Sequence, residues 1–341
     1  MKKKHTIIII VSILVFFTSC ANKKVYYNVS EQEILMNYNN ISTKTPSPWI
    51  DEDCVLFSRH DFFFNAYMIN EKGMMKIGNM AHGSSIQKYD NMAYWFTGSE
   101  KDNEMQLIGY DTVSNKRENI VTVFAENVVQ FLISGEILYV ITSASVDGSE
   151  KLMRTLQAVS MENNESVTIA QDVISVGVVD GSIHYLAISA EAYELRQYDI
   201  KTQTNIVIGS FQVDAEEEEP LFRLSSVNFT SAYLFFLVDH QTPTIYDIET
   251  NCLRQFEPMN GFCNIVAFET YAFMTEEKDD SEVTLFHISL ELGNMKEVAR
   301  FAADTVGLFV TSEHDAYISY GENIMHCTSE GDKNLILRVD V

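Results

Sequence analysis

Three stretches of the chain share one short pattern: Tyr110-Asp111-Thr112-Val113-Ser114-Asn115, Tyr198-Asp199-Ile200-Lys201-Thr202-Gln203 and Tyr246-Asp247-Ile248-Glu249-Thr250-Asn251. In each stretch an apolar segment runs into a polar turn that contains Asp, and a second apolar segment follows. Asp and Asn suit hairpin turns because their side chains accept hydrogen bonds from the neighbouring backbone. The pattern therefore predicts a β-hairpin at each of these places.

Weaker copies of the pattern occur at four more places and extend it into a repeat. With the second residue of each copy as a marker, seven markers stand 39 to 49 residues apart, with a mean spacing of 43. The weaker copies are Ile69–Gly73, Val159–Asn163, His287–Glu291 and Cys327–Gly331. Internal repeats of this period are typical of solenoids and propellers.

A second marker, an apolar segment with an aromatic residue, falls in step with the first. Its copies are Ala93–Phe96, Leu138–Ile141, His184–Ala187, Tyr233–Phe236, Ala272–Met274 and Tyr317–Ser319. A period of 40 to 50 residues with about four short strands per unit is typical of a β-propeller blade. We therefore predict an all-β fold, a seven-bladed β-propeller with four short antiparallel strands per blade. Six or eight blades, a pair of β-sandwiches and a β-solenoid are the alternatives.

The first predicted blade, Cys54–Asn79, looks one strand short. Propellers commonly close their ring by pairing segments from the two ends of the chain in one blade. We expect either Asn334–Val341 to complete this blade or Lys24–Ser30 to add a strand.

The composition places the chain among globular proteins and excludes one class of partner. Its 341 residues are 46% apolar and 21% charged, with 24 basic residues against 48 acidic ones and a net charge of −24. A phosphate backbone needs a basic face. The charge balance therefore excludes nucleic acid as a partner.

The first twenty residues resemble the signal of bacterial lipoproteins. Three lysines, Lys2 to Lys4, precede the apolar run Ile7–Phe17, which is too short to span a bilayer but fits a secretory signal. The run ends in Ser19-Cys20, a small residue before Cys as in the lipobox of that family. The resemblance implies a signal peptide at residues 1–19, cleavage between Ser19 and Cys20, and acyl chains on the Cys20 sulfur. An ordinary secretory signal with a chance Cys is the alternative.

These features predict the domain organisation and the location. Residues 20–50 would form the lipidated Cys and a tether rich in Asn, Ser, Thr and Lys, and residues 51–341 the propeller. Loss of the three lysines would leave the mature chain with a net charge of −27. We expect the protein on the extracytoplasmic face of a bacterial cell envelope, with the lipid bilayer as one partner through Cys20.

The repeat region also resembles bacterial extracytoplasmic lipoprotein propellers whose blades are of the low-density-lipoprotein-receptor type. Tyr94-Trp95-Phe96-Thr97 is similar to the Tyr-Trp-Thr-Asp strand of that receptor. The resemblance covers residues 53–341 at the level of the repeat. It implies the fold rather than an activity.

Four further cysteines allow two disulfides. A bridge between Cys54 and Cys327 would join the first and last blades, and one between Cys252 and Cys263 would close a short loop. An exported compartment permits disulfides. Four buried thiols are the alternative.

Motifs that carry chemistry are absent from the sequence. The histidines are scattered, and no zinc, nucleophile-elbow or nucleotide-binding pattern occurs. The acidic run Glu216–Glu219 is interpreted as a solvated loop, with binding of a basic peptide or Ca²⁺ as the alternative. We assign no catalytic residue, metal ligand or cofactor from the sequence.

The sequence thus favours a non-catalytic binding or scaffolding module. Its partner would be a protein, peptide or glycan, neutral or cationic because the chain is acidic. An envelope hydrolase or lyase with its active site at the propeller mouth is the first alternative, because loops from separate blades converge there without a linear motif. A structural subunit of an envelope complex is the second.

Overall fold

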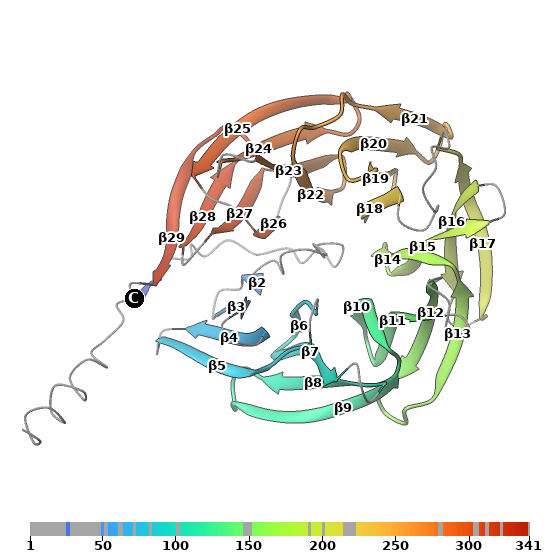
Figure 1. Ribbon diagram of the computed structural model, residues 1–341, viewed down its shortest axis with the longest axis vertical. Helices are drawn as coiled ribbons and strands as arrows, with labels where there is room; N and C mark the ends of the chain where they lie inside the picture. The colour runs from blue at the N-terminus through green and yellow to red at the C-terminus, as the bar shows by residue number, and fades with distance from the viewer. Residues whose placement is uncertain are drawn as a thin grey trace, which may run out of the picture.

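The computed structural model describes residues 25–27, 49–50, 54–60, 64–70, 73–81, 84–99, 103–145, 152–189, 192–199, 202–213, 223–278, 282–302, 307–310, 314–320 and 323–339. All named elements are β-strands, arranged as seven antiparallel sheets around a centre (Figure 1). The seven-bladed β-propeller predicted from the repeat is confirmed. Each sheet is one blade, and its strands follow one another from the centre outward.

The strands of the first four blades are as follows. Blade 1 holds β2 (Trp49–Ile50), β3 (Val55–His60), β4 (Phe64–Asn70) and β5 (Gly73–Asn79); blade 2 holds β6 (Gln87–Tyr89), β7 (Met92–Ser99), β8 (Glu104–Asp111) and β9 (Lys116–Phe124); blade 3 holds β10 (Asn127–Ser134), β11 (Ile137–Ser145), β12 (Leu152–Ser160) and β13 (Ser166–Gln171); blade 4 holds β14 (Val173–Val179), β15 (Ser182–Ser189), β16 (Ala192–Asp199) and β17 (Thr204–Phe211).

The last three blades complete the ring. Blade 5 holds β18 (Leu224–Phe229), β19 (Tyr233–Val238), β20 (Thr242–Asp247) and β21 (Cys252–Gln255); blade 6 holds β22 (Phe262–Phe268), β23 (Tyr271–Lys278), β24 (Glu282–Ser289) and β25 (Asn294–Ala302); blade 7 holds β26 (Gly307–Val310), β27 (Asp315–Tyr320), β28 (Asn323–Thr328) and β29 (Lys333–Val339), with β1 (Val25–Tyr27) as a fifth strand outside β29.

Ring closure differs from the prediction. Blade 1 is completed by Trp49–Ile50, and β29 is the fourth strand of blade 7 rather than part of blade 1. A segment within Lys24–Ser30 does add a strand, β1, but it joins blade 7 (Figure 1). The predicted tether therefore contributes two strands to the propeller. Strands of two and three residues carry too little alternation to be recognised in a sequence.

The two sequence markers correspond to fixed places in each blade. The polar turns join the third strand to the fourth, and the aromatic segments are the second strands. Asp111 caps its turn as predicted, because its carboxylate accepts hydrogen bonds from the Val113 and Ser114 amides at 2.9 and 3.0 Å. One residue with positive φ ends each of the seven turns, and these residues are Gly73, Asn115, Asn164, Gln203, Asn251, Gly293 and Gly331. Gly and Asn adopt a positive φ at little energetic cost, which explains why they recur at this place in the repeat.

The outer strands share a β-bulge, a feature that the repeat markers do not reveal. In six blades one residue of the fourth strand is skipped in the register with the third strand, and this residue is always Ile or Val. The skipped residues are Ile77, Ile120, Ile169, Ile208, Val298 and Ile336. A bulge interrupts the hydrogen-bond ladder at one residue and increases the twist of an edge strand.

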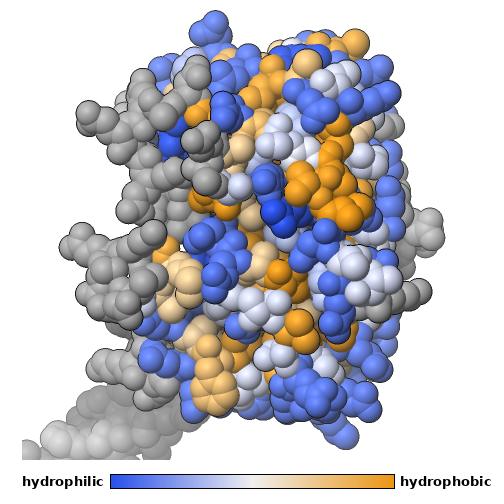
Figure 2. Space-filling model, turned by 90° about the vertical axis from the view of Figure 1, so that its right-hand side faces the viewer, coloured by the Kyte–Doolittle hydropathy of each residue, from blue (hydrophilic) through white to orange (hydrophobic). Residues whose placement is uncertain are grey.

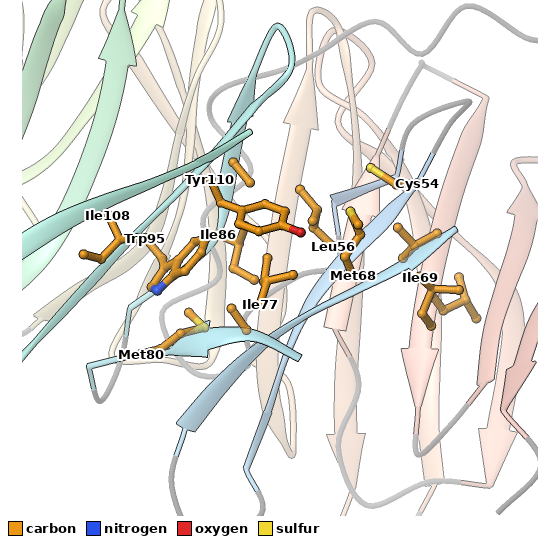
Figure 3. Packing of buried hydrophobic residues seen from close by; sticks show 14 of the residues in the cluster. Cys54, Leu56, Met68, Ile69, Ile77, Met80, Ile86, Trp95, Ile108 and Tyr110 are labelled. Carbon is orange, nitrogen blue, oxygen red and sulfur yellow. The ribbon is translucent and has the colours of Figure 1, made fainter. Parts of the chain in front are cut away.

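Apolar side chains fill the space between neighbouring blades. Between blades 1 and 2, Trp95 and Tyr110 lie beside Leu56, Met68 and Ile77 (Figure 3). The Trp95 indole is fully buried and donates a hydrogen bond to the Asn79 carbonyl at 2.9 Å. These interfaces form the core, since both faces of every blade are covered by a neighbour.

Side-chain amides join the innermost strands, whose inner edges lack a paired strand. Gln130 of β10 donates to the Val176 carbonyl of β14 at 2.8 Å and accepts from the Val176 amide at 3.1 Å. Asn228 of β18 likewise bonds the Ile265 carbonyl and the Ala267 amide of β22, both at 3.1 Å. Each amide acts as a clamp, because it satisfies buried backbone groups of the next blade and fixes the spacing of the two strands.

Candidate functional site

In some blades a tyrosine at the end of the third strand fills the wedge-shaped space between its own blade and the preceding blade. We call it the wedge tyrosine. Tyr246 of blade 5 is fully buried against the outer strand of blade 4. Its hydroxyl donates to Asn251 Oδ1 at 2.6 Å and accepts from the Ser210 amide at 3.0 Å. Burial raises the pKa of Tyr246, so its hydroxyl stays protonated and can donate. Tyr110 of blade 2 is placed in the same way against blade 1 and bonds Asn115 at 2.8 Å (Figure 3).

Blade 3 lacks this tyrosine, as do blades 1, 6 and 7, which have Ile69, Ile288 and Cys327 at the position. Val159 occupies the position, one residue before the turn that begins at Ser160. A valine does not reach the outer strand of blade 2 as a tyrosine would, and Asn164 has no phenol to bond. A groove of about 580 Å³ lies at this place, lined by Asn119, Ile120, Val121, Thr122, Val123, Phe124, Gln157, Val159, Asn164 and Ser166.

The lining of this groove carries no ionisable side chain. Val121, Val123 and Val159 are buried and form an apolar floor. The amides of Asn119, Gln157 and Asn164 and the hydroxyls of Thr122 and Ser166 supply hydrogen-bond donors and acceptors at its sides. The Phe124 side chain, 76% exposed, adds an aromatic ring at the end of β9. The groove suits a neutral ligand that combines polar and apolar groups, since an unpaired charge buried in it would cost several kcal/mol.

Part of the neighbouring rim is uncharged as well, although β9 itself begins with the exposed Lys116, Arg117 and Glu118. Outer strands β13 and β17 contain no Asp, Glu, Lys or Arg, whereas the other five outer strands each contain Lys or Arg. Val167, Ile206 and Val207 on this rim are 45%, 54% and 51% exposed. Figure 2 faces this side of the ring and shows apolar residues spread among hydrophilic ones. Charged residues on an edge strand discourage contact with other chains, and those of β9 lie before the six residues of that strand that line the groove.

Charged side chains buried near the inner strands already have partners. Arg223 is 5% exposed and binds both carboxylate oxygens of Asp239 at 3.0 Å. Glu276 is 4% exposed, accepts from the Asn260 amide at 3.0 Å and lies 3.6 Å from Lys278 Nζ. Their contacts are those of structural ion pairs. Among the described residues no group of three His, Cys, Asp or Glu side chains could hold a metal ion.

Of the histidines whose side chains are described, His287 and His314 both lie beside the Tyr271 ring, with 5.2 and 6.3 Å between the ring centres. His184 is buried in β15, and desolvation lowers its pKa. His326 Nε2 lies 2.7 Å from Asp315 Oδ1, and the His287 ring stacks on Tyr271. The side chains of His60 and His82 lie outside the described residues.

The predicted disulfide partners are not brought together. Cys252 is exposed on outer strand β21, whereas Cys263 is buried on innermost strand β22 of the next blade. Cys54 belongs to a cluster with residues of blades 1, 2 and 7, and Cys327 packs between blades 6 and 7. Because Cys252 and Cys327 are free thiols, neither predicted disulfide is formed in this structure.

Thiol reactivity tests this arrangement directly. Burial raises the pKa of Cys327 to about 12, so almost none of it is the reactive thiolate at pH 8. With a chain that starts after Cys20, we expect one thiol, Cys252, to react rapidly with a thiol reagent in the native state. Four thiols should react in denaturant. Two fewer in denaturant would show that one of the predicted disulfides forms.

Several predicted features lie outside the described residues. These are the signal peptide, the cleavage site at Ser19, the lipidation site at Cys20 and the acidic run Glu216–Glu219. No helix among the described residues is long and apolar enough to cross a bilayer.

The repeat alone does not identify the position of the groove. Tyr precedes the capping Asp in the three strong copies, and Val159-Ser160 is a copy in which both residues differ. Among the weaker copies, however, nothing in the sequence distinguishes this one as the place of a groove.

Comparison with known proteins supports the fold. No protein-family model and no curated protein sequence matches the chain. Among solved structures, an oligogalacturonate lyase from Vibrio parahaemolyticus matches with a TM-score of 0.53 and 13% identity over 93% of this chain and 96% of that chain. A prolyl endopeptidase matches with a TM-score of 0.56 and 11% identity over 89% of this chain.

The similarity does not extend to whole enzymes in every case. The tricorn protease matches with a TM-score of 0.54 and 12% identity over 91% of this chain but only 35% of its own. The chain likewise spans about half of the prolyl endopeptidase, 51% of its length. At these identities the likeness is one of β-propeller architecture alone, and the chain is therefore similar to the propellers of these proteins in fold.

Proposed function

We propose that this protein is a non-catalytic binding module that takes an uncharged ligand into the groove between blades 2 and 3. It would be held on the outer face of a bacterial membrane by acyl chains on Cys20, as its lipobox-like stretch implies. The observation that carries the proposal is the replacement of the wedge tyrosine by Val159, which coincides with a groove without ionisable groups.

The chemistry of the groove narrows the ligand class. In a chain of net charge −24, a ligand that bound through charge would be cationic and would meet carboxylates. The ten residues that line the groove offer none. A neutral peptide or a neutral glycan is therefore favoured over a basic peptide or a cation.

The test is a thermal-shift screen with uncharged peptides, neutral oligosaccharides, basic peptides and Ca²⁺. We expect an uncharged probe to raise Tm, since a ligand at 100 times its Kd adds about 2.7 kcal/mol to stability. This shift should be equal at pH 5.5 and pH 8.5 and in low and high salt, because no charge lines the groove. The Val159→Tyr variant, which copies the wedge residue of blades 2, 4 and 5, should lose the shift.

Two outcomes would contradict the proposal. Stabilisation by basic peptides alone, weakened by salt, would place binding on the acidic surface instead. Turnover of an envelope polysaccharide or peptide by the purified protein, retained in Val159→Tyr, would support the catalytic alternative at the propeller mouth.

A further inference from the structure

Alternate residues of an outer strand direct their backbone N–H and C=O away from the blade, and the second residue after the bulge is one of them. Ser210 stands two residues after the bulged Ile208, and its amide donates outward to the Tyr246 hydroxyl of blade 5 at 3.0 Å. Arg300 stands two residues after the bulged Val298, and its carbonyl accepts from Lys333 Nζ of blade 7 at 3.1 Å. In blades 4 and 6 a side chain of the next blade thus satisfies this position.

Blade 7 satisfies the same position with a strand. Arg338 stands two residues after the bulged Ile336 and pairs with Tyr26 of β1. The β1 pairing covers Leu337 to Val339, the three residues that follow the bulge. The outer edge of a blade in this propeller therefore accepts an added strand at this place.

In blade 2 the corresponding backbone position has no hydrogen-bond partner among the described residues. Thr122 stands two residues after the bulged Ile120, and it lines the groove. Within the described part of the chain, β9 is the last strand of its sheet and no hydrogen bond reaches the outward backbone of Thr122. The side chain that would correspond to Tyr246 is Val159, which carries no hydroxyl.

We infer that the ligand of the groove is an extended, uncharged peptide that joins blade 2 as a fifth strand, pairing with the outward N–H and C=O of Thr122. This inference rests on the proposed function and names its ligand. Six consecutive residues of β9, Asn119 to Phe124, line the groove, a length of about 20 Å in a strand. A peptide of about six residues matches that length.

A peptide fits these observations better than a glycan. A strand presents N–H and C=O groups at the fixed spacing that an unpaired edge requires, whereas sugar hydroxyls have no such period. Its alternate side chains would meet the apolar floor at Val121 and Val123 on one face. Phe124 supplies an exposed aromatic contact at the end of the edge.

The experiment uses a panel of acetylated, amidated hexapeptides in which Thr, Ser or Gln alternates with Val, Ile or Phe. We expect at least one to bind the full mature chain, and binding to slow hydrogen exchange of the Val121–Phe124 amides. Thr122→Pro removes the outward N–H at an edge position, where proline is tolerated, and should weaken binding at least tenfold. Val159→Tyr should weaken it as much, and Leu292→Ala, at an exposed site in blade 6 away from the groove, should not.

Changes in the peptide test the pairing independently of protein folding. Methylation of alternate peptide nitrogens removes the donors of one edge and keeps every side chain, so one of the two methylated forms should bind at least tenfold more weakly. Equal binding of both forms, or unchanged exchange at Val121–Phe124, would overturn strand addition. Binding of neutral oligosaccharides but of no peptide would overturn this inference and leave the proposed function standing. Failure of every uncharged probe would overturn both.

Discussion

Replacing Trp95 by alanine should lower the free energy of unfolding by about 3–5 kcal/mol, the range for removing a large aromatic side chain from a core. Trp95 is fully buried between blades 1 and 2 and lies 6.4 Å, centre to centre, from the Tyr110 ring. A Cβ on Gly78 would stand 2.6 Å from its ring, so the backbone of β5 is closely packed against the indole. Urea unfolding followed by far-UV circular dichroism measures the loss.

Two further variants serve as comparisons for the loss of stability in Trp95→Ala. Trp95→Phe keeps an aromatic ring but loses the hydrogen bond to the Asn79 carbonyl, so it should cost less than Trp95→Ala. Leu292→Ala, at a site 71% exposed, should change stability by less than about 0.5 kcal/mol. A loss below about 1 kcal/mol in Trp95→Ala would mean that the interface between these blades is not packed as described.

Removing the Asn228 clamp between blades 5 and 6 should have the second largest effect on stability. Asn228→Ala would leave the Ile265 carbonyl and the Ala267 amide without their partner, and a buried unsatisfied group costs about 1–3 kcal/mol. We expect the free energy of unfolding, measured with urea, to fall by about 2–4 kcal/mol. Water at the centre of the ring would partly hydrate the two groups and so reduces the full penalty. Hydrogen exchange should quicken in β22.

The control for this variant is Asn294→Ala, an exposed asparagine at the start of β25. It should leave stability within about 0.5 kcal/mol of the parent. Equal stability of Asn228→Ala and the parent would show that water replaces the amide in the centre and that the clamp contributes little.

The sequence was enough to predict the fold because a propeller repeats the same physical demands seven times. Each third-to-fourth turn needs a capping side chain and a residue with positive φ, and Asp111 with Asn115 shows both requirements in one short stretch. Ring closure was predicted less well. β1 and β2 have only three and two residues, and their place depends on which edge is open rather than on their own composition.

The candidate site was beyond prediction for a different reason. The groove lies where Val159 stands in place of a tyrosine, and a valine in a strand signals nothing unusual by itself. Only the comparison of Val159 with Tyr246, whose hydroxyl reaches the preceding blade, gives the substitution a meaning. The clamps are similar, because Gln130 and Asn228 are ordinary polar residues until their neighbours in space are known.

The strand β1 also determines how the ring would sit on a membrane. If Cys20 carries the anchor, four residues separate it from Val25, and a chain of that length spans at most about 18 Å. The outer edge of blade 7 would then lie within that distance of the lipid anchor. Blades 3 and 4 lie across the ring from β1 (Figure 1), so the groove beside blade 3 would lie on the far side of the ring from the anchor, where the full width of the propeller separates ligand from lipid.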